Sequence, residues 1–153
     1  MKITTEVLEA HLACKTKARL KLAGEADVVT EYEAMTAEAR RVSREAALAK
    51  LVARFPDACR GVPATDDALK EGKPLLVDAV LEDESVSLRL DALKKANGAS
   101  KLGDFHYLPV LHVHGDKVGK HQKLLLAVFG LVLDRVQGLR PAVGLVEIGR
   151  AHV

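Results

Sequence analysis

The middle of the chain carries short runs of leucine and valine that are typical of core β-strands. We expect strands over 75–81, 86–93 and 105–113, each bounded by polar or glycine-containing segments. The segment 94–103, which is rich in Lys, Gly and Ser, is predicted to be a flexible loop. Pro109 lies inside the third strand, and because proline has no N–H group we expect a bulge or a sheet edge there.

Helical patterns lie on both sides of these strands. A first helix is expected from Thr4 or Thr5 to about Gly24, and a long amphipathic helix over 30–55. The predicted apolar stripe of that long helix consists of Met35, Ala39, Val42, Ala46, Ala49 and Val52. A helix from about 117 to 137 is apolar nearly all round, which predicts burial against the sheet. It would lead by a crossover to a parallel strand over 142–146.

Composition limits the classes of function. A chain of 153 residues with 48% hydrophobic residues predicts one ordered domain. The net charge is only +2, so any nucleic-acid surface must be a local patch, and 3% aromatic residues argue against base stacking as the main binding mode. Two cysteines at unrelated positions predict no disulfide framework. No signal peptide and no membrane-length apolar run are seen, which favours a cytoplasmic setting without membrane partners.

Candidate chemistry gathers on the second and third strands. We expect Asp91 and His112 to lie on neighbouring strands of one sheet, and His114 and Asp116 follow soon after. Because carboxylates and imidazoles are metal ligands, Asp91, His114 and Asp116 form a candidate metal site. The alternatives are that Asp91 caps the following loop and that the His-x-His is an ordinary strand surface. Asp78 is a second candidate acid, with a plain surface position as its alternative.

Four short motifs occur in a characteristic order. They are Cys14-Lys-Thr-Lys-Ala-Arg-Leu20, Arg89-Leu-Asp91-Ala-Leu, His106-Tyr-Leu-Pro-Val110, and Gln122 followed by a long apolar helix. In this order the chain, from Lys2 to Val146, resembles the RecB-like nucleases, in particular the group related to CRISPR-associated exonucleases. The resemblance implies an α/β fold with a PD-(D/E)XK core: a helix, a three-stranded meander, a crossover helix and a strand, with an N-terminal helical extension.

The resemblance also implies a chemistry. An aspartate at the position of Asp91 would bind Mg²⁺ or Mn²⁺, and a Glu-x-Lys would follow the Tyr-x-Pro-Val lead-in on the next strand. Here the lead-in is followed by Leu111 and Val113 in place of the acid and the lysine. His112 and His114 then remain as substitute catalytic candidates beside Asp91, in a domain whose Glu-x-Lys motif is degenerate.

The DNA-binding residues are expected on two segments. Gln122 matches a glutamine that contacts nucleic acid in the family, and the lysines near it and in the 94–103 loop are placed to meet phosphates. These lysines are Lys94, Lys95, Lys117, Lys120 and Lys123. Cations near a helix N-terminus are disfavoured by the helix dipole, which hints at an anionic partner. The alternative is that they are solvated, and the same alternative holds for Arg40, Arg41 and Arg44 on the long helix.

Two further expectations concern Cys14 and the last seven residues of the chain. Cys14 matches the first of four cysteines that hold an iron–sulfur cluster in some relatives, but one thiolate is too few to hold a cluster. The last seven residues, from Glu147, correspond to one reading frame of a common sequencing adapter. We therefore expect a nuclease domain over 1–146, incomplete at its end, with a further C-terminal nuclease module as a missing partner. The alternative is a real strand end over 143–148.

Three functions follow from these observations. The first is a metal-dependent DNA nuclease. The second is a degenerate relative that binds DNA, or that positions a partner domain, without cleavage. The third is an unrelated small α/β domain with no role in nucleic-acid chemistry.

Overall fold

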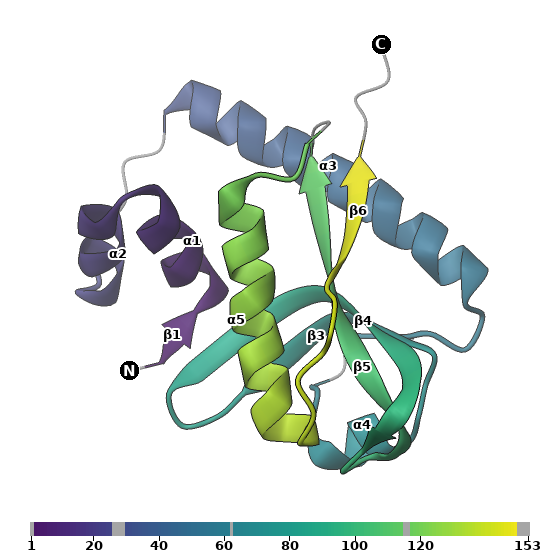
Figure 1. The fold of residues 1–153 in the computed structure, drawn as a ribbon. Coiled ribbons are helices and arrows are strands. Elements are labelled where there is room, and N and C mark those ends of the chain that lie inside the picture. The colour runs from purple at the N-terminus through teal and green to yellow at the C-terminus, as the bar shows by residue number, and fades with distance from the viewer. Residues whose placement is uncertain (1, 26–29, 62, 115–116, 150–153) are drawn as a thin grey trace.

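The structure is a computed structural model that describes residues 2–25, 30–61, 63–114 and 117–149. In chain order the elements are β1 (Ile3–Thr4), α1 (Thr5–Ala13), α2 (Lys15–Leu22), α3 (Glu31–Arg54), β2 (Cys59–Arg60), α4 (Asp66–Lys70), β3 (Leu75–Glu82), β4 (Val86–Ser100), β5 (Gly103–His114), α5 (Lys120–Gln137) and β6 (Leu145–Gly149). The fold of the described residues is mixed α/β, with one mixed sheet of six strands and five helices (Figure 1). Within the described ranges, no helix combines the length and the apolar character needed to cross a membrane.

The sheet is built around an antiparallel meander. Its strand order is β2-β3-β4-β5-β6, and β1 adds to the start of β4. The three strands β3, β4 and β5 run antiparallel in succession, whereas β6 runs parallel to β5. A parallel connection needs a crossover, and α5 provides it. The predicted meander, crossover helix and parallel last strand are therefore confirmed.

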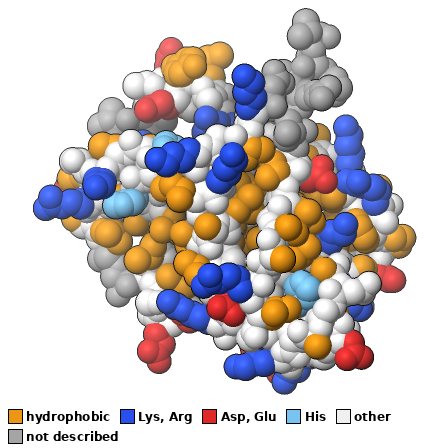
Figure 2. Space-filling model, viewed as in Figure 1, with side chains coloured by type: hydrophobic (Ala, Val, Ile, Leu, Met, Phe, Trp, Pro, Cys, Tyr) orange, Lys and Arg blue, Asp and Glu red, His pale blue; other side chains and the backbone are white. Residues whose placement is uncertain are grey.

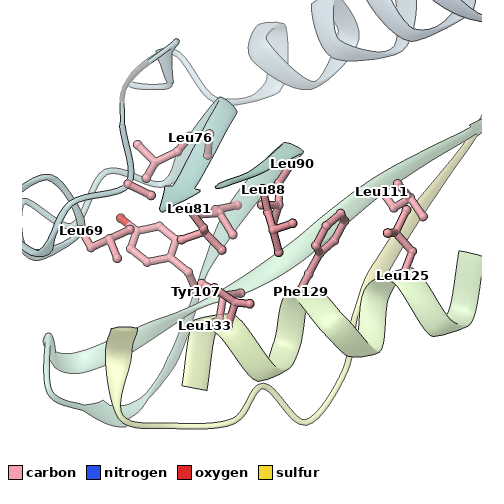
Figure 3. Packing of buried hydrophobic residues seen from close by; sticks show 14 of the residues in the cluster. Leu69, Leu76, Leu81, Leu88, Leu90, Tyr107, Leu111, Leu125, Phe129 and Leu133 are labelled. Atoms are coloured by element: carbon pink, nitrogen blue, oxygen red, sulfur yellow. The ribbon is translucent and has the colours of Figure 1, made fainter. Parts of the chain in front are cut away.

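The two faces of the sheet are covered differently. On one face α5 packs against a large core in which Tyr107, Phe129 and Leu133 are fully buried (Figure 3). On the other face α3 contributes the buried Leu48 and Leu51 and the half-buried Val52 to a smaller core. Hydrophobic burial therefore holds α5 far more firmly than α3, because the free energy scales with the apolar area removed from water.

The long helix α3 does not bury the stripe that we expected. A capping box of Thr30 and Glu33 starts the helix, as Ser/Thr-x-x-Glu sequences favour. Leu48 and Leu51 are buried, whereas Met35 is 72% exposed. The prediction assigned the wrong face of α3. The stripe contains more apolar residues than the leucine face, but most of them are alanines, and each leucine buries more area.

The segment 94–103 is a second correction. It is not a flexible loop, because β4 continues to Ser100 and pairs with β5 across a tight turn. Gly98 and Gly103, at φ of +136° and +142°, supply backbone conformations that other residues rarely adopt. The glycines that suggested a loop therefore allow a twisted hairpin end.

Smaller corrections concern a break in the first helix, the exposed residues of α5 and the start of the last strand. The first predicted helix is interrupted at Cys14, whose extended backbone separates α1 from α2. α5 is buried against the sheet as predicted, whereas Leu124 and Leu131 on its apolar surface are 42% and 46% exposed. The last strand begins at Leu145 rather than at 142, because the preceding residues run back along α5, where Gly144 approaches Leu126.

Pro109 does not mark a sheet edge. It lies inside β5, which has neighbours on both sides, and it pairs with Leu93 of β4. The ladder between β5 and β6 begins only at Val110. The proline thus lies one residue before the ladder with β6 starts, where its missing N–H is tolerated.

Candidate functional site

Two strands lose their regular alternation at the same level of the sheet. On β3, Leu76 and Ala79 enter the same core, although residues three apart in a regular strand point to opposite faces. Between them, Asp78 has φ of +53°, and it is the one non-glycine residue with positive φ among the described residues. The left-handed backbone at Asp78 reverses the alternation, so that Val77 and Asp78 both lie on the α3 side.

The same break occurs on β4 directly opposite. Leu90 and Leu93 both enter the core under α5, and Asp91 lies between them. The pairs Val77–Ala92 and Ala79–Leu90 place Asp78 opposite Asp91 in the antiparallel ladder. Two carboxylates from neighbouring strands therefore converge on the space beneath α3.

A single guanidinium bridges these two acids. Arg44 of α3 donates one hydrogen bond to Asp78 and another to Asp91. Arg60 of β2 donates to the second oxygen of Asp78 at 3.2 Å and to Glu45 at 2.7 Å. Asp78 is only 7% exposed. Carboxylates opposite one another repel, and Arg44 offsets that repulsion where water has little access.

The electrostatics of the acids follow from these contacts. Burial alone would raise the pKa of Asp78, but the hydrogen bonds and charges of Arg44, Arg60 and Arg89 lower it below its ordinary value. For Arg44, burial opposes the charged form, but the two aspartates raise its pKa. Asp78 and Arg44 are therefore both favoured in their charged forms.

His112 on β5 completes the cluster. Its backbone N–H donates to the Oδ2 atom of Asp91 at 2.6 Å, and its Nε2 atom lies 3.2 Å from the hydroxyl of Ser43. Within the described part of the chain, its buried Nδ1 atom has no hydrogen-bond partner. Burial lowers the pKa of His112, with Asp91 opposing the shift and His114 and Arg44 adding to it. The imidazole is thus favoured in its neutral form.

A third carboxylate approaches from α1. The Thr5 hydroxyl accepts a hydrogen bond from the N–H of Arg89 at 2.8 Å and lies 3.2 Å from the carbonyl of the same residue, which fixes α1 to β4 near Asp91. One helical turn along, Glu9 keeps an exposed surface but has a raised pKa, because nearby protein atoms desolvate it and the charge of Asp91 opposes its ionisation. Arg40 partly offsets both effects. Glu9 therefore flanks the acid pair.

The positions matched to the Glu-x-Lys motif point away from this cluster. Leu111 and Val113 are 8% and 6% exposed and belong to the core under α5, together with Phe129. Alternation along β5 then directs His112 toward α3 and Asp91. A motif at 111 and 113 would not reach the acids in this register, and His112 is the β5 side chain that does.

The predicted metal set is not assembled as a unit. Asp91 is engaged by Arg44 and by the His112 backbone, while His114 is exposed at the end of β5. Asp116 lies outside the described residues. In the part of the chain that the structure describes, no group of three or more His, Cys, Asp or Glu side chains is arranged to hold a metal ion.

The residues predicted to bind DNA lie at two separate ends of the sheet. Lys94 lies over the ring of Phe55 at 5.8 Å, and Lys95 lies over Phe105 at 4.7 Å. Both lysines pair with the first half of β5, whereas Lys120 and Lys123 belong to the first turn of α5 after β5 ends. At about 3.3 Å per residue, the seven steps along β5 from Tyr107 to His114 separate these two groups by roughly 23 Å.

The first turn of α5 has two structural features of its own. Gln122 accepts a hydrogen bond from the N–H of Gly119 at 2.9 Å and so caps the helix. Lys123 lies with Arg140 beside an apolar groove of about 490 Å³ between α5 and the segment that leads to β6. On the face seen in Figure 2, hydrophobic side chains are likewise interspersed with Lys and Arg. Lys120 is exposed at the start of the helix.

Both cysteines are free thiols. Cys14 is exposed at the junction of α1 and α2, and hydrogen bonds from the backbone of Lys17 and Thr16 lower its pKa. Cys59 is half-buried on β2. Within the described ranges, nothing near Cys14 supplies the further thiolates that an iron–sulfur cluster would need.

Three members of the cluster were not predicted, or were predicted to lie elsewhere. Arg44 was expected either at phosphates or in solvent, Asp78 was expected more at the surface, and Glu9 was not singled out. The available signal for Asp78 was an acid in the centre of an otherwise apolar strand, which is costly unless a cation pairs with it. Neither a family model, a curated protein nor a solved structure matches the chain.

Proposed function

We propose that this chain is a RecB-like DNA nuclease domain with a PD-(D/E)XK core, in which phosphodiester hydrolysis depends on a divalent metal and the Glu-x-Lys motif is degenerate. One observation carries the proposal. Asp78 and Asp91 face each other on neighbouring strands, with His112 of the third strand beside them. Three strands of a meander thus direct two acids and a histidine into one half-buried space.

The acid pair is suited in type to a metal ion. Mg²⁺ and Mn²⁺ prefer carboxylate oxygens, and two carboxylates with added water or phosphate oxygens are a common set of ligands. In the structure a cation, the Arg44 guanidinium, already lies between these oxygens. Asp78 and Asp91 would therefore hold the metal only when Arg44 is displaced. Once bound, the metal would activate water and offset charge on the scissile phosphate.

His112 takes the position of the missing motif. Its backbone is fixed by Asp91, and its Nδ1 atom lacks a protein partner in the described part of the chain. A phosphate oxygen or a water molecule would satisfy that atom. His114 lies two residues further along the same face of the strand, and we assign it a secondary role in contacting substrate. The DNA backbone would be held by Lys94 and Lys95, and by Gln122, Lys120 and Lys123 at the start of α5.

A second candidate function is a catalytically inactive domain that binds nucleic acid or acts as a scaffold for a larger nuclease. Two observations favour it. The Arg44 guanidinium bridges the acid pair, and Leu111 and Val113 are buried in the opposite core. A protein whose acids pair permanently with Arg44 would keep the fold without the chemistry.

A cleavage and binding experiment separates these functions. The wild-type protein, Asp91→Ala and Arg44→Gln are incubated with single- and double-stranded DNA in Mg²⁺ or Mn²⁺, with Asp104→Ala as an exposed-acid control. Calorimetry with Mn²⁺ alone gives a readout that does not depend on activity. We expect Arg44→Gln to bind Mn²⁺ more tightly than the wild type, and Asp91→Ala to abolish both binding and cleavage.

The outcomes differ for each hypothesis. Cleavage that Asp91→Ala abolishes and Asp104→Ala leaves intact supports the nuclease. Salt-dependent DNA binding without cleavage, even in Arg44→Gln, supports the inactive alternative. Absence of metal binding, of cleavage and of DNA binding would overturn both and favour an unrelated α/β domain.

A further inference from the structure

The outer face of α3 carries an apolar stripe that no other part of the described chain covers. Its seven members are Tyr32, Met35, Ala39, Val42, Ala46, Ala49 and Ala53, and all are exposed. Tyr32, Met35 and Val42 are exposed by 78%, 72% and 54%. The steps between successive members alternate between three and four residues over the whole helix. This spacing is that of the contact positions in a two-helix coiled coil.

The stripe is distinct from the face that holds α3 on the sheet. The sheet side uses Arg44, Leu48 and Leu51, which lie on the opposite side of the helix. A helix of 24 residues is about 36 Å long, at 1.5 Å per residue. Large side chains such as Tyr32 and Met35 contribute little to the stability of the monomer from this position, so their contiguous exposure indicates a contact surface.

We propose that this face of α3 pairs with the same face of a second copy of the chain, with the two helices antiparallel. The distribution of side-chain sizes along the stripe supports this arrangement. An antiparallel pairing whose twofold axis passes between residues 40 and 41 places Tyr32 against Ala49 of the second copy and Met35 against Ala46 of the second copy. The central layer places Ala39 against Val42 of the second copy. Every larger side chain then meets an alanine, which gives even packing from Tyr32 to Ala49, while Ala53 lies beyond the matched layers.

The parallel alternative fits less well. It would stack Tyr32 on its own copy at one end and set the alanines at 46, 49 and 53 against alanines at the other end. The helices would be forced apart at the bulky end and would leave gaps at the small end. A twofold antiparallel contact avoids both problems and is self-complementary, as closed homodimers require.

Charge along the edge of the stripe is compatible with self-pairing. Glu31, Glu38 and Glu45 line one edge, and in an antiparallel pair this edge meets the same edge of the second copy. Two of these acids already have intramolecular cations, since Glu38 pairs with Arg41 at 2.6 Å and Glu45 with Arg60 at 2.7 Å. These pairs reduce the repulsion that bare carboxylates would exert.

The geometry also leaves the candidate site unchanged. The two sheets would lie on opposite sides of the helix pair, because the stripe faces away from the sheet. Asp78 and Asp91 lie beneath the inner face of α3. The dimer therefore does not depend on the proposed nuclease function, and its failure would leave that proposal untouched.

Sedimentation of the full chain between about 1 and 200 µM tests the contact. We expect the mass to rise from 16.5 kDa toward twice that value as the concentration increases. Val42→Glu and Met35→Glu should keep the protein monomeric over the whole range. Leu131→Glu on α5, where the side chain is 46% exposed, is the matched control and should dimerise like the wild type. A monomer at every concentration, or a dimer that Val42→Glu does not weaken, would overturn the proposal.

Cross-linking tests the orientation. In a Cys14→Ser background, Met35→Cys combined with Ala46→Cys should form an intermolecular disulfide under mild oxidation, because these positions face each other in the antiparallel register. Met35→Cys alone should not cross-link, since its counterpart in the second copy lies far along the helix. Cross-linking by the single variant would indicate a parallel contact and contradict the proposed register.

Discussion

Asp78 and Asp91 face each other across β3 and β4 and share the guanidinium of Arg44. Like charges directly opposite each other in a sheet are destabilising, so the pair persists only because a cation lies between them. Arg44 comes from α3, which has few other buried contacts with the sheet. The ion-pair cluster therefore does two things, since it holds the acids together and attaches α3 to the sheet.

Replacing Arg44 should be costly. Arg44→Ala leaves two largely buried carboxylates without their shared partner, and the loss of one member of such a cluster typically costs about 3 kcal/mol. We expect a fall of that order in the free energy of unfolding, measured by urea denaturation at pH 7. Arg41→Ala, which breaks the exposed pair with Glu38, should cost far less, because solvent screens that pair. Equal effects of the two variants would show that the cluster does not stabilise the fold.

The backbone at Asp78 offers a test that is independent of its charge. Asp78→Ala and Asp78→Gly both remove the carboxylate, but only glycine adopts φ of +53° without steric cost. We expect Asp78→Gly to be more stable than Asp78→Ala by about 1 kcal/mol. At Asp91, which has no positive φ, the order should reverse, because glycine weakens an ordinary strand position. Denaturation of the four variants under one condition makes both comparisons.

How far the sequence predicts the fold depends on the strength of each pattern. The strands at 75–82 and 103–114 and the helix at 120–137 were predicted well, because their apolar residues are large and closely spaced. The face of α3 was predicted wrongly, because alanines define a stripe as readily as leucines do while burying much less area. The hairpin end after Leu93 was missed, since glycine permits an irregular strand as well as a loop.

The candidate site, like the fold, was predicted only in part. The expectation that Asp91 and His112 occupy neighbouring strands of the sheet that α5 crosses is confirmed, although both side chains point to the opposite face, toward α3. The part played by Arg44 could not be predicted, since its bonds span 34 and 47 residues of sequence and depend on how α3 crosses the sheet. The broken alternation at Asp78 and Asp91 was also missed, because a pattern of residue types assumes regular strands.

Gln137 joins the end of α5 to the centre of the sheet. Its side chain is fully buried, accepts a hydrogen bond from the N–H of Tyr107 at 2.8 Å, and donates to the carbonyls of Tyr107 and Leu139 at 3.1 Å each. Gln137→Leu keeps the approximate volume but leaves three backbone groups unpaired, so we expect a loss of about 3 kcal/mol in the free energy of unfolding.

The matched control for Gln137 is another glutamine on the same helix. Gln122 makes one capping bond to Gly119 near the surface, and Gln122→Leu should cost no more than about 1 kcal/mol. Thermal or urea unfolding of both variants measures how much unfolding free energy each of them loses. If Gln137→Leu proved as mild as Gln122→Leu, the hydrogen bonds between α5 and β5 would not contribute as the structure indicates.

Tyr107 gives the fold a dependence on alkaline pH. Its ring is fully buried, its hydroxyl donates to the carbonyl of Lys73 at 2.7 Å, and burial raises its pKa from 10.0 to about 12. In the unfolded chain the phenol ionises near pH 10, so the stabilisation from keeping Tyr107 neutral is complete below pH 10 and is lost as the pH rises toward 12. Tyr107→Phe cannot ionise. At pH 8 the variant should be less stable by about 1 kcal/mol, because the bond to Lys73 is gone. Between pH 10 and 12 the stability disadvantage of Tyr107→Phe should shrink and then reverse. Urea denaturation across that range measures the difference between the two proteins. A difference that stays constant would mean that the Tyr107 hydroxyl titrates alike in the folded and unfolded states.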